Sequence, residues 1–503
     1  MIPARVSREG PQLGVIAAGH AVSARAGADV LRAGGNAVDA AIAAMLTSFV
    51  CEPLLTGLGA GGYMLVVAPG RRPVLLDFFV EAPGRGADPS RLGELIPISV
   101  SFGDATQTFK VGPASVGTFG MPAGICAAAA RFGSVPLAQL AAPAAALARE
   151  GVELNRQQAY VVEILEATIR STAQASALFA PAGRLLRAGE RVVQPELGDA
   201  LERLGAEGAR PFYEGDIAGA IVEWLGERGG IVTTADLRAY EVLERDPLRV
   251  PYRGREVLTN PPPAAGGILM ALALELLDAS PAPPSLAQIV EVMERTQSAR
   301  TAEFLVGLGD PQYVHTLLPQ ARGPLGSTTH VSALDRDGWA CSVTSSAGSA
   351  SGVIVPGTGV YLNNMLGEED LNPLGFHLHP PGRRLPSMMS PTVVLSGGVP
   401  ELAVGSAGSN RIRSAILQTI IRCLDEGMAA QAAVEAPRVH FEDGVLYAEP
   451  GIDGATLERC AAKITRFREL NLFFGGAQAA AREADGSFSG GGDPRRGGAA
   501  LVV

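Results

Sequence analysis

Cysteine is scarce in this sequence of 503 residues, and acidic residues outnumber basic ones. The five cysteines are far apart, odd in number and without the spacing of metal ligands, which argues against a disulfide framework and a zinc-type site. We therefore expect buried thiols, no metal and no cofactor. The formal net charge of -10 and the pI of about 5.3 argue against binding to nucleic acid or an anionic membrane surface. The cysteines are Cys51, Cys126, Cys341, Cys423 and Cys460.

Long apolar runs are also absent. No stretch reaches the roughly 18 uninterrupted apolar residues of a membrane span, and the first ten residues lack the apolar core of a signal peptide. We therefore expect a cytoplasmic protein without membrane contact. With 47% hydrophobic and 18% charged residues, the composition is that of a folded globular chain rather than a disordered one.

A β-hairpin is predicted within residues 326–346. Residues 331–334 and 339–344 are short runs rich in strand formers, and Asp337-Gly338 between them supplies a turn that tolerates positive φ. We expect the chemistry of the protein at the open end of this hairpin.

The register of the hairpin decides which side chains meet at that end. If Leu334 pairs with Trp339, Thr328 lies opposite Ser345, with Ser346 beside it. A threonine at the start of one strand would then meet hydroxyl groups at the end of the other.

A threonine hydroxyl needs a neighbouring base to become a good nucleophile, and a freed α-amino group on the same residue is one such base. The unperturbed pKa of an α-amine, roughly 7.7 to 8.0, suits that task near neutral pH. This chemistry requires a cut between Ser327 and Thr328, which would leave fragments 1–327 and 328–503. Without further support, Thr-Thr-His before a strand is usually only the start of that strand.

Several motifs in a fixed order support the catalytic interpretation, because together they resemble the γ-glutamyltransferase family of the N-terminal-nucleophile hydrolase superfamily over nearly the whole chain. The resemblance implies self-cleavage before Thr328 and acyl transfer through that residue. It also implies one intertwined domain, 1–503. The matching stretches are Gly-Gly-Asn-Ala-Val-Asp-Ala-Ala (34–41), Thr-Gly-Leu-Gly-Ala-Gly-Gly-Tyr (56–63), Leu-Asp-Phe (76–78), Thr-Thr-His (328–330) with Asp-Gly (337–338), Leu-Asn-Asn (362–364), Met-Ser-Pro-Thr (389–392) and Gly-Ser-Ala-Gly (405–408).

Strands and helices alternate along the sequence, which predicts an α/β protein with central sheets covered by helices. The four-layer αββα sandwich of the N-terminal-nucleophile hydrolases is what the resemblance implies. The helix that begins after Asn36 has almost no polar face, so we expect it to be buried, with Asn36 and Asp39 as its capping box. His377 and His379 have no acidic or thiol cluster near them in sequence, so we expect a solvated loop rather than a metal site.

A glycine loop at residues 405–410 opens a predicted helix at 412–424. Backbone N–H groups at such a helix start carry the positive end of the helix dipole, which suits a tetrahedral oxyanion. The resemblance assigns this role to the amides of Gly408 and Ser409, although the family has a second glycine where this chain has Ser409. It also aligns Ser346 with the threonine that hydrogen-bonds the nucleophile. Without the resemblance, the loop would be a simple capping turn.

The expected substrate-binding residues depart from the family. Phe79 stands where the arginine that clamps a substrate carboxylate is expected, Met365 replaces a glutamine, and Met388 replaces one of two carboxylate-binding serines. A phenylalanine cannot replace the bidentate contact of an arginine. These three residues therefore predict a more apolar acyl pocket, unless they belong to the hydrophobic core.

The other expected substrate-binding residues are polar or small. Gly348 replaces an asparagine, Glu368 stands for an aspartate, and Ser387 keeps the first of the two serines. A substrate carboxylate left unpaired would lose roughly a hundredfold or more in binding. Arginines elsewhere could restore an anion site; the candidates are Arg85, Arg383 and Arg384.

The resulting hypothesis is a self-processing N-terminal-threonine amidohydrolase or acyltransferase. It would act on a small-molecule amide whose acyl group is not a standard γ-glutamyl group, with water or an amine as acceptor. Its two fragments would form a heterodimer, and such heterodimers could pair. The alternatives are a genuine γ-glutamyltransferase or glutathione hydrolase with a relocated carboxylate clamp, and an uncleaved, non-catalytic binding scaffold.

Overall fold

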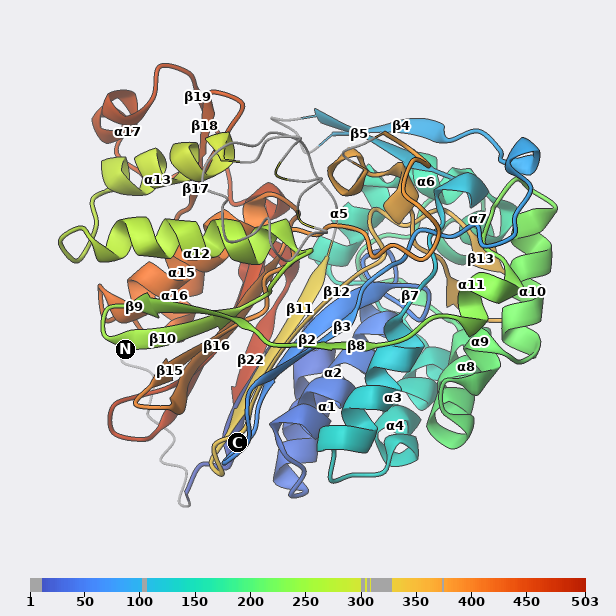
Figure 1. Cartoon of the computed structure of the whole chain (residues 1–503), viewed down its shortest axis with the longest axis horizontal. Helices are drawn as coiled ribbons and strands as arrows, with labels where there is room; N and C mark the ends of the chain where they lie inside the picture. The colour runs from blue at the N-terminus through green and yellow to red at the C-terminus, as the bar shows by residue number, and fades with distance from the viewer. Residues whose placement is uncertain (1–10, 102–105, 300–303, 305–307, 309–327, 373–374) are drawn as a thin grey trace.

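The computed structural model describes most of the chain (Figure 1). Within the described part, no helix combines the length and the hydrophobicity that crossing a bilayer requires. Residues 319–327, where the Pro/Gly-rich sequence before the proposed cut predicts a loop, lie outside the described residues. The described residues are 11–101, 106–299, 304, 308, 328–372 and 375–503.

Two antiparallel β-sheets form the centre of the molecule. The larger has the strand order β22-β1-β11-β12-β2-β3-β8, and the smaller has the order β21-β20-β16-β15-β10-β9. The bounds of the larger sheet are β22 Ala499–Val502, β1 Gly14–Ala18, β11 Thr329–Asp335, β12 Ala340–Ser346, β2 Gly61–Val67, β3 Val74–Phe78 and β8 Leu243–Arg245. Those of the smaller are β21 Phe488–Gly492, β20 Gly476–Arg482, β16 Val399–Ala407, β15 Thr392–Ser396, β10 Arg255–Thr259 and β9 Leu248–Tyr252.

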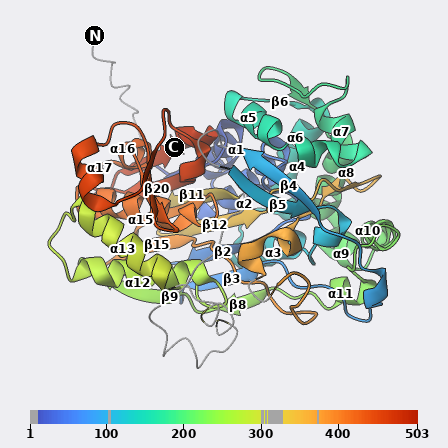
Figure 2. The same ribbon diagram turned by 90° about the horizontal axis from the view of Figure 1, so that it is seen from above.

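Helices cover the outer face of each sheet, so the layers run helix, sheet, sheet, helix (Figures 1 and 2). This arrangement confirms the expected α/β fold with four αββα layers. The helices on the larger sheet include α1 Ala21–Arg32, α2 Ala37–Cys51, α3 Met121–Phe132, α4 Leu137–Glu150 and α8 Pro195–Glu207. Those on the smaller sheet include α12 Ala265–Asp278, α13 Leu286–Ser298, α15 Arg411–Leu424 and α16 Ala430–Glu435.

Smaller elements surround these layers. Figure 2 shows α5 to α7 and α9 to α11 on the side opposite to α12 and α13. The bounds of the smaller helices and strands are β4 Ile96–Ser101, β5 Thr106–Val111, β6 Val152–Glu153, α5 Arg156–Ile164, α6 Glu166–Arg170, α7 Ala173–Phe179, β7 Arg191–Val192, α9 Arg210–Tyr213, α10 Asp216–Gly226, α11 Thr234–Arg238, β13 Ile354–Val355, β14 Val360–Tyr361, β17 Val439–Glu442, β18 Val445–Ala448, α17 Gly454–Cys460 and β19 Ile464–Arg466.

The five inner strands of the larger sheet, β1, β11, β12, β2 and β3, are buried on both faces, because alternate side chains enter different cores. Val331 and Ala333 of β11 lie in the core on the side of α2, which packs against this strand. Leu334 points the other way and packs between the sheets with Leu402 and Val404 of β16. The open end of the hairpin is thereby held between two packed layers.

Helix α2 is buried along its whole length, as its sequence predicts. Asn36 accepts hydrogen bonds from the Asp39 and Val38 backbone N–H groups, and the Asp39 carboxylate accepts from the Asn36 backbone N–H. This geometry confirms the capping box. The Asp335 carboxylate accepts from the Ala37 N–H at 2.9 Å, which ties the hairpin to the start of α2.

The predicted hairpin register was wrong by one residue. Leu334 pairs with Ala340 rather than with Trp339, so Thr329 lies opposite Ser345. The cause is a three-residue loop rather than a two-residue turn, because Asp335 Oδ1 accepts hydrogen bonds from the N–H groups of residues 337 and 339. Glycine supplies the φ of 90° at position 338.

Candidate active site

Thr328 immediately precedes β11, and the residue is only 3% exposed. Continuing the β11–β12 register by one residue sets Thr328 opposite Ser346 rather than Ser345. Ser346 is therefore the hydroxyl residue nearest to Thr328 across the ladder. The shifted register thus brings Ser346, rather than the expected Ser345, opposite Thr328.

Thr328 and Ser346 line one cavity together with most of the other expected site residues. It has room for a water-sized sphere over only about 30 Å³, and the residues that line it are buried. Residues from both sides of position 328 contribute to it, so the cavity exists only in the folded chain. The lining residues are Phe79, Thr328, Ser346, Met365, Glu368, Leu371, Ser387, Met388, Met389, Ser409 and Ile412.

One wall of this cavity is apolar. Phe79, Met365 and Met388 all line it, so these residues are part of the pocket surface and not only of the core. Phe79 stacks on Tyr63 of β2 with a ring-centroid distance of 5.3 Å, which fixes its ring. Substrate atoms beside this wall would meet hydrocarbon and thioether groups.

The arginines that could have replaced the carboxylate clamp lie elsewhere. Arg384 donates to the Phe79 carbonyl at 2.5 Å and lies 3.4 Å from Asp77, and Arg85 pairs with Asp236 and Glu81. Among the described residues that line the cavity, none is an arginine or a lysine. The described part of the pocket therefore offers no cationic side chain to a substrate carboxylate.

Glu368 gives the cavity a buried acid. Its Oε1 accepts a hydrogen bond from the Ser349 N–H at 3.1 Å. Gly348 does not line the cavity, but it lies behind this group: a Cβ there would lie 2.6 Å from Glu368 Oε1 and 1.9 Å from Asn364 Oδ1. The glycine thus allows Glu368 and Asn364 to pack closely. Ser387, by contrast, lines the cavity directly.

The loop that connects β16 to α15 is shorter than predicted, because residues 405–407 belong to β16 and only residues 408–410 lie between the strand and the helix. Ser409 lines the cavity, whereas Gly408 is packed so that a Cβ would lie 2.7 Å from Gly475 Cα. The φ of Ser409 is 54°, a left-handed conformation that costs a non-glycine residue about 1 kcal/mol or more. The loop thus keeps a strained backbone next to the cavity, at the positive end of a helix dipole.

His330 was not singled out from the sequence as a functional residue. Its Nδ1 lies 2.8 Å from Thr344 Oγ1 and its Nε2 lies 2.9 Å from Ser332 Oγ, in the layer between the sheets. Burial lowers the pKa of His330 to about 3, so the ring is neutral at neutral pH. A Cβ on Gly405 would lie 2.2 Å from this ring, so β11 and β16 approach closely only because residue 405 is glycine.

Two more buried residues that the sequence did not single out, Glu52 and Arg496, contact the Thr328–Thr329 segment. Thr329 Oγ1 donates to both carboxylate oxygens of Glu52 at 3.1 Å, and Arg496 Nη1 donates to the Thr328 carbonyl at 3.4 Å. Burial raises the pKa of Glu52 to about 7 and lowers that of Arg496 to about 10. No local sequence pattern could have brought these residues together, because they lie far apart in the chain.

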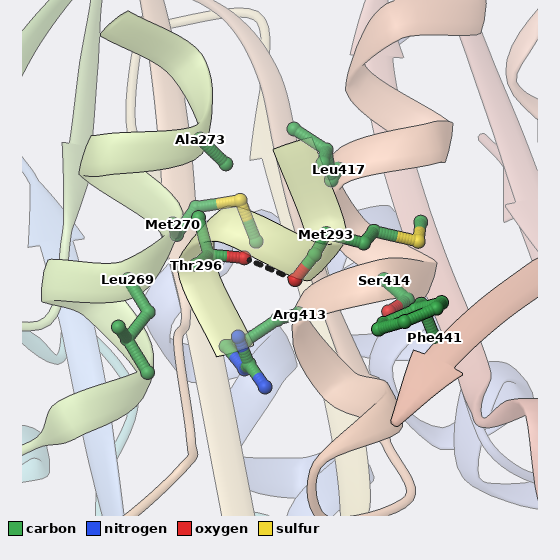
Figure 3. Close-up of a pocket in the computed structure, with 9 residues that line it drawn as sticks. All are labelled: Leu269, Met270, Ala273, Met293, Thr296, Arg413, Ser414, Leu417 and Phe441. Carbon is green, nitrogen blue, oxygen red and sulfur yellow. Dashed lines mark hydrogen bonds between the residues drawn. The ribbon is translucent and has the colours of Figure 1, made fainter. Parts of the chain in front are cut away.

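Another, smaller cavity of about 10 Å³ lies between α12, α13 and α15 (Figure 3). It contains none of the expected site residues. Arg413, the cation in its lining, donates to Gln297 Oε1 at 2.8 Å. The lining residues are Leu269, Met270, Ala273, Met293, Thr296, Arg413, Ser414, Leu417 and Phe441.

A search of the described residues finds no group of three His, Cys, Asp or Glu side chains that could hold a metal ion. His379 is buried, rather than solvated as expected, and its Nε2 lies 3.0 Å from the Leu371 carbonyl oxygen. Cys51 and Cys341 are buried free thiols, while Cys126, Cys423 and Cys460 are partly exposed.

The chain is similar to known proteins in both sequence and structure. The sequence profile described as "Gamma-glutamyltranspeptidase" matches residues 23–322 and 315–503. The chain is 30% identical to the Acylase ACY 1 proenzyme of Pseudomonas sp. (strain SE83), over 95% of this chain and 91% of that protein. It is also 30% identical to the Glutathione hydrolase proenzyme of Escherichia coli (strain K12), over 96% and 90%. The crystal structure of cephalosporin acylase from Bacillus halodurans matches with a TM-score of 0.83 and 25% identity, over 100% and 99% of the two chains.

Proposed function

The chain belongs to the gamma-glutamyltranspeptidase family of N-terminal-nucleophile amide hydrolases and transferases, and we propose that it is a self-processing enzyme with Thr328 as its nucleophile. The observation that carries the proposal is the single buried cavity that joins Thr328, Ser346 and Ser409 to the expected substrate-binding residues. A threonine that only began a strand would not have to line a cavity together with these residues.

Self-cleavage before Thr328 would leave two fragments, 1–327 and 328–503, and the fold explains how they would stay together. In the larger sheet, β1 of the first fragment lies between β22 and β11 of the second, and β12 pairs with β2 of the first. Strands from both fragments therefore alternate within one hydrogen-bonded sheet. Separating them would break ladder hydrogen bonds and expose both cores.

In the proposed reaction, Thr328 Oγ1 bonds to the carbonyl carbon of the substrate amide while its proton passes to the Thr328 α-amine. The N–H groups of Gly408 and Ser409 donate to the oxyanion that forms. The carbon–nitrogen bond then breaks, and the α-amine gives its proton to the leaving amine. Water or a second amine attacks the resulting ester by the same route, which releases the acyl group and restores Thr328.

We propose that the acyl group is less polar than γ-glutamyl. An acylase and a glutathione hydrolase are equally identical to the chain, so identity does not choose between their substrates. The cavity supports the choice, because Phe79 and Met388 form an apolar wall and Glu368 would repel a substrate carboxylate. An acyl group that is uncharged, or that carries an amine facing Glu368, fits these surroundings better.

Intact-mass analysis of the wild-type protein and two variants tests the role of Thr328. The wild type should give fragments 1–327 and 328–503. Thr328→Ala should stay in one piece and lose at least about a thousandfold in turnover, whereas Thr328→Ser, the matched control, should still be cut. An uncut wild-type chain with full turnover would refute the mechanism; an uncut and inactive one would support a binding scaffold instead.

A pair of anilides tests the acyl group. We expect faster aniline release from phenylacetyl anilide than from γ-glutamyl anilide under the same conditions. Preferential release from γ-glutamyl anilide would show that the enzyme is a genuine γ-glutamyltransferase and that our interpretation of the apolar wall is wrong.

A further inference from the structure

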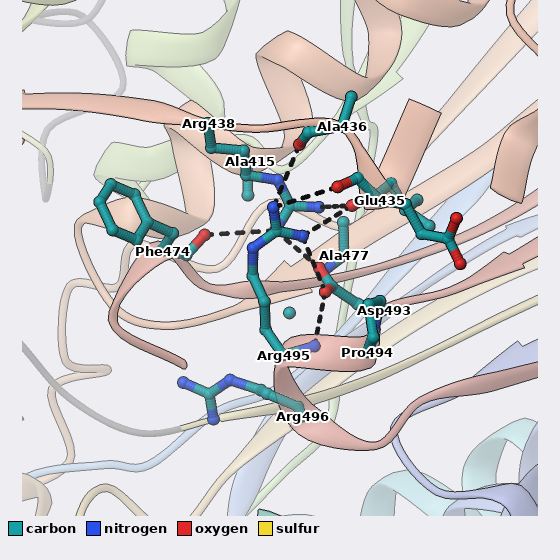
Figure 4. Close-up of polar contacts among 12 residues, drawn as sticks. Ala415, Glu435, Ala436, Arg438, Phe474, Ala477, Asp493, Pro494, Arg495 and Arg496 are labelled. Carbon is teal, nitrogen blue, oxygen red and sulfur yellow. Dashed lines mark hydrogen bonds and ion pairs between the residues drawn. The ribbon is translucent and has the colours of Figure 1, made fainter. Parts of the chain in front are cut away.

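Arg496 ends a short C-terminal turn, residues Pro494–Arg496, which a buried group of charges anchors (Figure 4). Arg438 lies 2.6 Å from Asp493, and Arg495 lies 3.1 Å from Asp493 and donates to Glu449 at 2.6 Å. Two arginines and two acids thus neutralise one another within this cluster. Figure 4 shows the guanidinium of Arg496 directed away from it.

The Arg496 guanidinium instead reaches the proposed active site. The residue is 6% exposed, and its guanidinium donates to the carbonyl oxygens of Thr328 and Leu472, at 3.4 Å each. A Cβ on Gly408 would lie 3.6 Å from Arg496 Nη2. The cation therefore lies between the nucleophile and the loop expected to hold the oxyanion.

Glu52 stabilises the adjacent residue of the same segment. Its carboxylate accepts from Thr329 Oγ1, and a Cβ on Gly19 would lie 2.6 Å from Glu52 Oε1 and 2.7 Å from Thr329 Oγ1. The absence of a side chain at Gly19 thus makes room for this contact. Arg496 and Glu52 hold two consecutive residues, Thr328 by its carbonyl and Thr329 by its hydroxyl.

On the basis of the proposed function, we propose that Arg496 is a positioning residue that orients Thr328 and keeps its freed α-amine uncharged at neutral pH. Glu52 has the opposite effect on the charge of that amine. The nitrogen and carbonyl oxygen of one residue are at most about 3.6 Å apart, so Arg496 Nη1 lies within about 7 Å of that amine. A cation at this distance disfavours the protonated amine. The amine is then ready to accept the proton of the threonine hydroxyl.

The other charged groups nearby do not cancel this effect. Asp493 is already paired with two arginines, and burial raises the pKa of the Cys51 thiol, so that thiol is neutral. Glu52, whose pKa burial raises to about 7, is only partly charged near neutral pH. A negative charge on Glu368, which lines the same cavity as Thr328, would favour the protonated amine as Glu52 does. The variants below leave Glu368 unchanged.

The test is the pH profile of kcat for anilide hydrolysis, measured together with the extent of cleavage by intact mass. Arg496→Met removes the charge but keeps an apolar stem, and it should move the acid limb of the profile up by about one pH unit. Near pH 6.5 this corresponds to a roughly tenfold lower kcat, with little change in KM. Arg496→Lys should keep the limb within about 0.3 units of wild type, as should Arg468→Met, a control at an exposed site.

Glu52→Gln provides the opposite perturbation, and it also serves if Arg496→Met fails to fold. Removing a negative charge should move the acid limb down by a few tenths of a pH unit. Opposite shifts from the two variants cannot come from general damage to the fold. The inference is overturned if cleaved Arg496→Met keeps the wild-type limb, or if Glu52→Gln moves the limb upward. Retained turnover in Thr328→Ala, assayed in parallel, would instead show that the proposed function itself is wrong.

Discussion

Replacing Glu52 by glutamine should change how the stability of the protein depends on pH. The carboxyl group is buried, and burial raises its pKa from 4.5 to about 7, although Thr329 and Arg496 act in the opposite direction. Between these two values the folded protein keeps a proton that the unfolded chain releases. The contribution of this group to stability is therefore complete below pH 4.5 and is lost as pH rises through about 7.

The size of the effect follows from the difference between the two pKa values. Each unit corresponds to about 1.4 kcal/mol, so the wild type should lose roughly 3 kcal/mol of unfolding free energy through this group between pH 4.5 and pH 8. Glutamine does not titrate, and its amide oxygen can still accept the hydrogen bond of Thr329. The difference in unfolding free energy between the two proteins should change by about that amount over the same pH range.

Urea unfolding followed by tryptophan fluorescence at several pH values measures this difference. The comparison uses the Thr328→Ala background, which we expect to stay in one piece, so that cleavage does not complicate it. Glu469→Gln, at an exposed position, is the matched control and should follow the parent protein. If Glu52→Gln shows the same pH dependence as its parent, the carboxyl group does not titrate as its burial requires.

Three further predictions concern the surroundings of the nucleophile. Gly405→Ala should lower the unfolding free energy by about 2 kcal/mol or more, because its methyl group would lie 2.2 Å from the His330 ring. The control Gly219→Ala, at a position with open space around it, should stabilise the protein slightly. Equal urea midpoints for the two variants would contradict the packing argument. Ser346→Ala should slow both self-cleavage and anilide hydrolysis by about a hundredfold in timed mass and absorbance assays, and unchanged rates would exclude a role for that hydroxyl. Glu368→Gln should lower kcat/KM about tenfold or more for acyl anilides that carry an amine, and less than threefold for uncharged ones; equal losses would mean that Glu368 does not contact the acyl group.

The sequence was most informative where a local pattern has one physical solution. Asn36 and Asp39 could be identified as a capping box because their spacing matches one helical turn, and the buried helix behind them follows from its apolar composition. The hairpin around Asp337-Gly338 was also recognised, but its register was not, because the choice between a two- and a three-residue loop depends on the Asp335 side chain.

The expected site residues came from the resemblance rather than from pattern, and the fold brings most of them to one cavity. His330, Glu52 and Arg496 were missed for a common reason. Their positions become meaningful only when segments distant in sequence are packed together, as Gly405 is against His330 and the C-terminal turn is against Thr328.

The sequence by itself determined many of the elements, the family and the choice of Thr328 as the proposed nucleophile, because strand and helix periods, caps and contiguous motifs are local properties of the chain. The tertiary structure decided the register that sets Thr329 opposite Ser345, the apolar wall of the cavity and the charges next to Thr328. Burial is the physical reason: how strongly a charge acts, and whether a methionine lines a pocket or fills a core, depends on which distant residues exclude water around it.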